Sequence, residues 1–275
     1  MNHNQQRKVA VINDFSSFGR CSLAASIPIL SAMRVQCCAV PTAVFTNHTG
    51  FKHFSFADMS ARMNAYIEDW QATGLAFSAI ASGYLASIEQ VDFVKRFVAS
   101  FPEGQPIVFV DPVMGDYGKL YPSFGRDVAE GLRDLLSIAD YLTPNLTEAC
   151  VLANRPYDIA LTDAEIGALA EEIAAPHAKG IVISGVPRDD HLVNFVYTRQ
   201  TGVVCIDAKK IGPDRSGTGD VFASVVLGSL IRGCTLPEAV RNAVDFVSSA
   251  VARAEEMEIP TTDGLPFEEV LSKLW

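Results

Sequence analysis

The sequence lacks any long run of apolar residues. Its longest clearly apolar stretch covers residues 221–231, which is about half of the length that a helix needs to cross a bilayer. The N-terminal segment MNHNQQRKVAVIND has no apolar core of the kind found in signal peptides, and it leads directly into a strand pattern. These absences predict a cytoplasmic protein without a membrane partner.

Clusters of positive charge and paired cysteine motifs are also missing. The 22 Lys and Arg are outnumbered by 32 Asp and Glu, which gives a net charge of −10. This charge disfavours non-specific binding to nucleic acid or to acidic membranes. The six cysteines are scattered, and the adjacent pair Cys37-Cys38 lacks the C-x-x-C spacing of zinc or redox sites. We expect buried, reduced thiols and no nucleic-acid partner.

Two nucleotide-binding fingerprints are absent as well. The chain has no GxxxxGK[ST] motif of a P-loop, and its first strand–helix turn, NDFSSFGR, does not supply the GxGxxG motif of dinucleotide-binding enzymes. A dinucleotide oxidoreductase is therefore disfavoured.

The chain does contain a regular alternation of strand and helix patterns. Strand patterns occur at residues 9–12, 37–40, 77–82, 107–110, 181–184, 194–198 and 203–206. Helix patterns occur at residues 22–33, 58–72, 88–100, 125–137, 163–175, 218–232 and 236–254. Apolar strands that alternate with helices predict a mostly parallel sheet covered on both faces. Residues 191–207 instead predict a hairpin with the turn RQTG. We expect one doubly wound α/β domain over residues 1–275.

Polar residues follow several predicted strands, at the sheet edge where α/β proteins bind ligands. Asp111 follows the apolar strand IVFV, where it either caps the next turn or binds a metal. Asn145 and Glu148, in TPNLTEA, have the spacing of a helix capping box, so they have a structural interpretation as well. Oxygen ligands from neighbouring strand ends suit Mg²⁺, which also takes waters and substrate phosphates. Asp111 and Glu148 are candidate metal ligands on this basis.

The segment GPDRSGTGD, residues 212–220, precedes the most apolar helix pattern of the chain. Glycines at a helix start leave backbone N–H groups that can converge on an anion, and the three residues 217–219 provide that pattern. A carboxylate beside an anion pocket repels a finished phosphate but can accept a proton during phosphoryl transfer. Asp220 is therefore the candidate base. Arg215, in the same loop, is expected to be solvated, with a phosphate contact as the alternative.

The motifs DPVMGDYGKLY, TPNLTEA and GTGD, in this order and spacing, resemble those of the ribokinase superfamily of small-molecule kinases. The segments TAVFTNHTG and SGYL are similar to those of the pyridoxal kinases within it. The likeness extends from about Val9 to Ala250. It implies a ribokinase-like three-layer α/β/α sandwich and a homodimer. It also implies ATP-dependent phosphorylation of the 5′-hydroxymethyl group of pyridoxal, pyridoxine or pyridoxamine.

The resemblance also implies roles for individual residues. It makes Asp220 the catalytic base, and the residues of the anion hole are Gly217, Thr218 and Gly219. It places Mg²⁺, bound with ATP, near Asp111 and Glu148, and it leaves open a monovalent cation such as K⁺. The vitamin pocket would consist of Asp14, Phe45, His48, Thr49 and Tyr84. The ATP-binding residues would be Asp111, Tyr121, Asn145, Glu148, Ser184, Ile211 and Pro213.

Side-chain chemistry is compatible with this pocket. Tyr84 and Phe45 are predicted to sandwich an aromatic ring, and His48 and Thr49 to bond its substituents, although such residues often serve only the fold. Asp14 stands where typical pyridoxal kinases carry Ser. Because a carboxylate can pair with a protonated pyridine nitrogen or an amine, we hypothesise that Asp14 favours a cationic vitamer.

Two other functions remain as alternatives. Hydroxymethylpyrimidine kinases phosphorylate a similar hydroxymethyl group, but they tend to carry GTGC where this chain has GTGD, and they lack the NHTG loop. A non-catalytic B6-binding protein on the same scaffold would not need Asp220 together with the glycine loop and both acidic residues.

Overall fold

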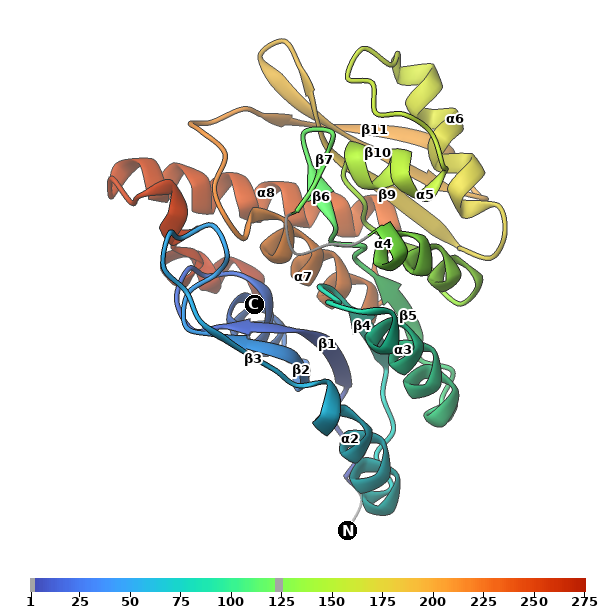
Figure 1. Cartoon of the computed structure of the whole chain (residues 1–275). Helices are drawn as coiled ribbons and strands as arrows, with labels where there is room; N and C mark the ends of the chain where they lie inside the picture. Colours follow the sequence, from blue (N-terminus) through green and yellow to red (C-terminus); the bar gives the residue numbers. More distant parts are fainter. Residues whose placement is uncertain (1–2, 122–125) are drawn as a thin grey trace.

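The fold is built around a nine-stranded sheet. The structure, a computed structural model, describes residues 3–121 and 126–275. The strands are β1 (Lys8–Ser16), β2 (Gln36–Phe45), β3 (Phe56–Asp58), β4 (Ala79–Ser82), β5 (Ile107–Val110), β8 (Tyr141–Leu142), β9 (Gly180–Arg188), β10 (His191–Thr198) and β11 (Gly202–Lys209). Their spatial order is β11-β10-β9-β8-β5-β4-β1-β2-β3 (Figure 1). The strands from β9 to β2 in this order are parallel, whereas β3, β10 and β11 are antiparallel to their neighbours.

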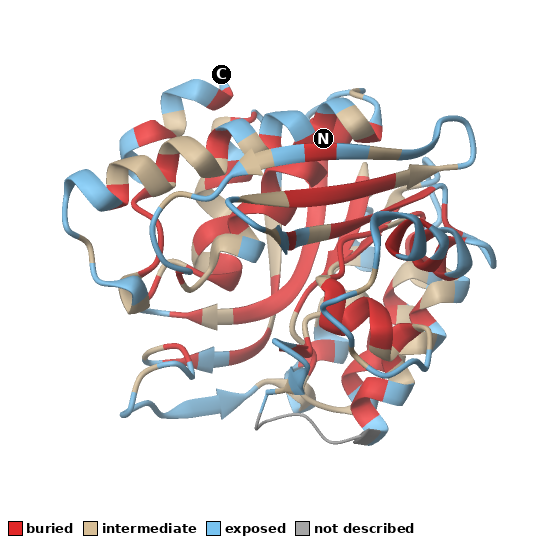
Figure 2. Ribbon diagram, turned by 90° about the horizontal axis from the view of Figure 1, so that it is seen from above, coloured by how far each residue is buried: buried red, intermediate tan, exposed pale blue. Residues whose placement is uncertain are grey.

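Helices cover both faces of this sheet. One face carries α2 (Ser60–Thr73), α3 (Ile88–Ser100), α4 (Arg126–Leu132), α5 (Leu146–Leu152) and α6 (Asp163–Ala174). The other face carries α1 (Ser22–Ala32), α7 (Thr218–Ile231), α8 (Leu236–Glu256) and the 3₁₀ helix η3 (Phe267–Leu274). Figure 2 shows the central strands buried between the two helical layers. The predicted three-layer α/β/α arrangement with a mostly parallel sheet is confirmed.

The apolar pattern of the chain explains which elements are central. Residues Val9–Ile12 of β1 are at most 4% exposed, because helices cover both sides of this strand. All residues of α7 from Val221 to Ile231 are buried, so the longest apolar stretch of the sequence forms a core helix. Within the described ranges, no helix combines the length and the apolar character needed to cross a membrane.

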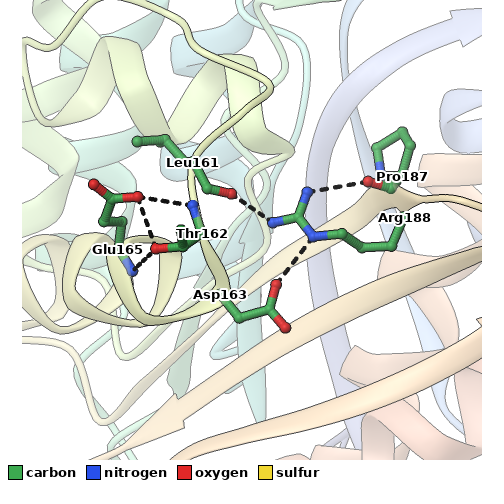
Figure 3. Close-up of polar contacts among 6 residues, drawn as sticks. All are labelled: Leu161, Thr162, Asp163, Glu165, Pro187 and Arg188. Carbon is green, nitrogen blue, oxygen red and sulfur yellow. Dashed lines mark hydrogen bonds and ion pairs between the residues drawn. The ribbon is translucent and has the colours of Figure 1, made fainter.

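Local polar signals determine where helices begin. Thr162 caps α6, and its side chain and backbone exchange hydrogen bonds with Glu165 in a capping box. The Arg188 guanidinium, at the end of β9, contacts Asp163 at 3.0 Å and donates to the Leu161 carbonyl oxygen at 2.7 Å (Figure 3). The start of α6 is therefore attached to the end of β9.

Two of the predicted elements differ in the structure. The predicted strand at 181–184 continues to Arg188 and forms a second hairpin with β10. Gly185 and Pro187 favour a break, but Gly185 lies at a β-bulge, where its N–H donates to the Asn194 side chain at 3.1 Å. The predicted helix at 125–137 consists of α4 followed by the 3₁₀ helix η1 (Arg133–Ser137), and its first residue lies outside the described residues.

Candidate active site

The carboxyl ends of four parallel strands meet at one edge of the sheet. Strand pairing places four residues in one row: Ile12, Ser82, Val110 and Leu142. The residues that follow them are Asn13, Gly83, Asp111 and Thr143. The expected polar edge therefore exists, and it joins segments that are far apart in the sequence.

The glycine loop adjoins this edge at the start of α7. Gly217 is the N-cap of α7 and has a φ of 76°, which disfavours any side chain. A Cβ atom at this position would lie 2.3 Å from the backbone oxygen of Arg20. By contrast, a Cβ atom on Gly219 would meet nothing within 4 Å. The helix start therefore faces open space at Gly219, where an anion can approach the N–H groups of the first turn.

Asp220 lies in the first turn of α7, next to that open space. The amide nitrogen of Asn13, at the end of β1, is 3.3 Å from Asp220 Oδ1. Burial raises the pKa of Asp220 to about 6, and the nearby charge of Asp14 adds to this, while Ser22 N–H and the Asn13 amide oppose it. A carboxylate with this pKa is ionised at neutral pH and can still accept a proton effectively.

Asp111 and Glu148 occupy neighbouring positions from different elements. Asp111 follows β5 and accepts a hydrogen bond from the Thr143 hydroxyl at 3.1 Å. Glu148, in α5, is buried and accepts from the N–H groups of Asn145 at 2.8 Å and Met114 at 3.1 Å. The predicted capping box between Asn145 and Glu148 is present. Glu148 thus has the structural role that the spacing predicted, and its carboxylate also lies near Asp111.

The charges of this pair fit a hard divalent cation. Burial raises the pKa of Asp111 well above its usual value, and the charges of Glu148 and Asp220 add to the shift. Burial also raises the pKa of Glu148 to about 8, against the effect of its backbone donors. A cation beside these carboxylates would favour their ionised forms. The described part of the chain has no group of three or more His, Cys, Asp or Glu suited to a metal. Phosphates and water would therefore supply the remaining ligands, as is common for Mg²⁺.

The residues predicted to bind the nucleotide come from different segments of the chain. Asn145 donates to the Gly115 carbonyl oxygen at 2.8 Å, and the backbone N–H of Ser184 donates to the Pro144 carbonyl oxygen at 2.9 Å. Tyr121 is exposed, and its backbone N–H donates to the Met114 carbonyl oxygen. Ile211 and Pro213 lie in the segment between β11 and α7, and Pro213 is exposed.

A small hairpin, which the sequence patterns did not predict, reaches this segment. It consists of β6 (Gly115–Asp116) and β7 (Lys119–Leu120). At its tip, the Tyr117 hydroxyl donates to the Asp214 carboxylate. The hairpin thereby connects the region after β5 with the loop that precedes α7.

The aromatic residues of the predicted vitamin pocket do not form two parallel walls. The ring centroids of Phe45 and Tyr84 are 6.3 Å apart, and the planes meet at 75°. Phe45 stacks instead on Phe56, at 5.2 Å and 25°. A ring stacked on both would need two roughly parallel planes, so the two rings as placed do not form the predicted sandwich. The two rings form adjoining walls, and contact with a substrate remains a prediction.

His48 uses both ring nitrogens within the chain. Its Nδ1 accepts a hydrogen bond from the Gly50 N–H at 3.0 Å, so its Nε2 carries the proton and donates to the Thr262 carbonyl oxygen at 2.7 Å. The ring is buried beside Gly19, whereas Thr49 is exposed. His48 therefore attaches its loop to the 3₁₀ helix η2 (Thr261–Asp263), and substrate contacts of His48 and Thr49 remain predictions.

Asp14 is also engaged by its own chain. Asp14 is 6% exposed, and its two side-chain oxygens accept hydrogen bonds from the hydroxyls of Ser16 at 2.9 Å and Ser22 at 2.6 Å. Burial raises the pKa of Asp14, although the two serines oppose the shift. The carboxylate connects β1 with the start of α1, and its pairing with a cationic substrate remains a prediction.

Comparison with known proteins is consistent with this geometry. The family model described as phosphomethylpyrimidine kinase matches residues 18–264. The chain belongs to the phosphomethylpyrimidine kinase family. A Bordetella avium protein named pyridoxine/pyridoxal/pyridoxamine kinase is 28% identical over 239 residues, which cover 82% of this chain and 78% of that protein.

Solved structures of similar proteins have the same fold. A Bacteroides thetaiotaomicron protein, provisionally described as a phosphomethylpyrimidine kinase and crystallised with pyridoxal, is 35% identical with a TM-score of 0.94, over 98% of this chain and 96% of that one. Pyridoxal kinase from Lactobacillus plantarum is 26% identical with a TM-score of 0.90, over 98% and 96% of the two chains. The resemblance to pyridoxal kinases of the ribokinase superfamily is confirmed.

Sequence reasoning missed two residues of this family member that hold the site together. Asn13 was overlooked beside Asp14, but its amide oxygen accepts from the Tyr84 N–H at 2.8 Å while its nitrogen faces Asp220. Arg215 was expected to be solvated, yet it is buried and pairs with Glu255 at 2.6 Å. A polar residue at the end of an apolar strand was the available signal for Asn13. No local pattern indicated the partner of Arg215, which lies 40 positions away.

The backbone of Arg215 supports the glycine loop directly. Its carbonyl oxygen accepts from the Thr218 hydroxyl at 2.8 Å, and its guanidinium donates to the Ile259 carbonyl oxygen at 2.7 Å. The next residue, Ser216, donates its N–H to the Thr261 carbonyl oxygen at 3.1 Å. The glycine loop and the His48 loop are therefore both attached to the segment around η2.

We expect His48→Ala to loosen the loop of residues 46–55. The KM for the vitamin substrate should rise about tenfold, the effect of roughly one lost hydrogen bond, with little change in the KM for ATP. His48→Gln, which keeps a donor and an acceptor, should recover part of the loss. Thr262→Ala is the matched control, because it retains the backbone carbonyl that His48 contacts. Steady-state kinetics for both substrates test this, and an unchanged vitamin KM in His48→Ala would contradict it.

Proposed function

We propose that this chain transfers the γ-phosphoryl group of ATP to the 5′-hydroxymethyl group of pyridoxal, pyridoxine or pyridoxamine. The observation that carries the proposal is the position of Asp220. Its carboxylate has a pKa of about 6 and lies in the first turn of α7, one residue from the open space at Gly219. A base next to an anion pocket suits the transfer of a phosphoryl group.

The chemistry assigned to the chain has two parts. Asp220 accepts the proton of the hydroxymethyl group while the hydroxymethyl oxygen attacks the γ-phosphorus. The bond between the γ-phosphorus and the bridging oxygen breaks, and ADP leaves with its electrons. The N–H groups at the start of α7, beside Thr218 and Gly219, offset the negative charge on the transferring phosphoryl group. Gly217 allows the backbone turn that directs these groups outward.

Asp111 and Glu148 are the residues that would hold Mg²⁺ with the ATP phosphates. When bound, this ion neutralises phosphate charge and orients the phosphates. The nucleotide would lie between the segment before the glycine loop and the β6–β7 hairpin, on the basis of four predicted contacts: Tyr121, Ser184, Ile211 and Pro213.

Other features implied by the family resemblance complete the proposal. We propose a single kinase domain over residues 1–275 that forms a homodimer in the cytoplasm. A monovalent cation such as K⁺ belongs to the same set of predictions. Each of these can be tested on purified protein or in cells, independently of the residue roles.

The deciding experiment is an ATP-consumption assay with Mg²⁺. It compares pyridoxal, pyridoxine, pyridoxamine and hydroxymethylpyrimidine at equal concentrations. Turnover of any B6 vitamer with formation of its 5′-phosphate supports the proposal. If no substrate consumes ATP but pyridoxal binds, the chain is a binding protein and the proposed mechanism is wrong.

Hydroxymethylpyrimidine kinase is the second candidate because the matching family model carries the description phosphomethylpyrimidine kinase. Hydroxymethylpyrimidine presents a similar hydroxymethyl group to the same base. Turnover of this substrate alone, with no B6 vitamer accepted, would favour this candidate over ours.

Asp14 provides a test of vitamer preference. If its carboxylate pairs with a cationic vitamer, Asp14→Ser should lower kcat/KM for pyridoxamine relative to pyridoxal by about tenfold, the effect of one lost charged hydrogen bond. Asp14→Asn is the matched control, since it removes the charge but keeps an oxygen that can accept from Ser16 or Ser22. An unchanged ratio of kcat/KM in Asp14→Ser would remove Asp14 from the substrate pocket.

A further inference from the structure

A partly open cavity of about 30 Å³ lies between the sheet and α7, and the proposed base is part of its wall. Its polar wall includes Asp220, Asp111 and Ser82, and its apolar wall includes Phe109 and Leu227. A buried water needs roughly 10–15 Å³ of space for its centre, so the cavity has room for a water molecule.

Ser82 lines this cavity, and within the described part of the chain its hydroxyl has no hydrogen-bond partner. Ser82 is 4% exposed, and its Oγ is one of two buried side-chain polar atoms without a hydrogen-bond partner among the described residues. A buried hydroxyl without a partner is destabilising, and such groups are rare in native proteins. Its position in the cavity wall therefore indicates a partner inside the cavity.

The other neutral polar groups of the wall are already paired. The Asn13 amide nitrogen faces Asp220, and its oxygen accepts from the N–H groups of Asp14 at 2.9 Å and Tyr84 at 2.8 Å. The hydroxyls of Ser26 and Ser224 are 3.0 Å apart. Each hydroxyl has one proton, and a backbone carbonyl oxygen of α1 or α7 is within reach as its acceptor. Among the described residues of the wall, the hydroxyl that lacks a partner is that of Ser82, and the charged acceptors are the two carboxylates.

We propose that this cavity is a binding site for one ordered water, which accepts a hydrogen bond from Ser82 and donates to Asp111 and Asp220. The hydrogen-bond donors and acceptors match, because the water accepts one bond from the hydroxyl and has two protons, one for each carboxylate. Three polar partners are typical of a buried water. A desolvated cation would need more oxygen ligands than this half-apolar wall provides.

This water makes Ser82 a positioning residue for the proposed base. Asn13 bonds one oxygen of Asp220, and the water also bonds Asp220 and lies between it and Asp111. The existence of the site does not depend on the substrate, whereas its effect on turnover rests on the proposed function.

The first test is structural. Crystal structures at about 1.5 Å resolution should show a water peak within hydrogen-bond distance of Ser82 Oγ and both carboxylates. The peak should be absent in Ser82→Ala and present in Ser26→Ala, the matched control that removes a paired hydroxyl from the same wall. An empty cavity in the wild type, or a peak unchanged in Ser82→Ala, would overturn the proposal. An anomalous signal in the cavity after a soak with Rb⁺ would replace the water by a cation and overturn it as well.

The second test is kinetic. Ser82→Ala should lower kcat about fivefold to tenfold, the effect of one hydrogen bond to a charged group, and leave both KM values unchanged. Ser82→Thr, which keeps the hydroxyl, should recover most of kcat, which a purely structural role would not explain. A wild-type kcat in Ser82→Ala would overturn the positioning role. If the wild type turns over no vitamer, the proposed function fails, but the crystallographic result still decides the water site.

Discussion

Asp220→Asn is expected to lower kcat by about 10²-fold or more, which is the usual effect of removing a positioned base. The amide has the shape of the carboxylate but cannot accept the substrate proton. In the wild type, kcat/KM should fall as the pH decreases through about 6, because Asp220 is then protonated. This acidic limb should be missing from the residual activity of the variant. Steady-state kinetics between pH 5 and 8 are the measurement.

Stability measurements distinguish the expected fall in kcat of Asp220→Asn from an effect of misfolding. Burial raises the pKa of Asp220 from 3.8 to about 6 in the folded chain. Above that pH the buried carboxylate is ionised, which lowers the stability of the folded chain relative to the unfolded chain. The Asn variant should therefore have a Tm at pH 7.5 that is equal to or above that of the wild type. Asp163→Asn is the matched control, since Asp163 also lies in the first turn of a helix but is exposed. Equal losses in both variants would contradict the role of Asp220.

Gly217→Ala should abolish most activity and destabilise the fold together. A Cβ atom at this φ of 76° would lie 2.3 Å from the Arg20 oxygen, so the backbone must shift. We expect a loss of about 2–4 kcal/mol in the free energy of unfolding from strain and overpacking. Displaced N–H groups should lower kcat by about 10²-fold or more, as in other anion holes. Urea denaturation and steady-state kinetics measure the two effects.

Gly219→Ala tests the effect on activity without the expected loss of stability in Gly217→Ala. A Cβ atom there meets nothing within 4 Å, and Ala is the better helix former by about 1 kcal/mol, so the fold should be as stable as the wild type or more so. The methyl group nevertheless enters the space assigned to the phosphoryl group, so kcat/KM should fall by at least tenfold. A fully active Gly219→Ala would show that the phosphoryl group does not occupy this space.

Local patterns predicted the elements whose signals lie within a few residues. The apolar run after Asp220 predicted α7, the turn RQTG predicted the β10–β11 hairpin, and TPNLTEA predicted the capping box at the start of α5. The continuation of β9 was missed, because Gly185 and Pro187 are locally typical of a break. The partner that keeps this strand extended is the Asn194 side chain of the next strand.

The candidate site likewise has features that the sequence predicted and features that it did not. The order of strands and helices was enough to predict that Asp111, Glu148 and Asp220 lie at one sheet edge, since parallel strands end on the same side. The arrangement of side chains there was not predictable. Phe45 and Tyr84 meet edge-on, and β3 supplies a third ring, Phe56, that stacks on Phe45.

The sequence by itself determined the class of fold, the sheet edge that carries the site and the identity of the candidate base, because periodicity and helix-start motifs are local properties. The tertiary structure alone decided which groups those residues contact. His48 finds its acceptor 214 positions later in the chain, and Arg215 finds Glu255 in α8. Such pairings depend on how distant segments pack, and burial then sets the pKa values of Asp111, Glu148 and Asp220.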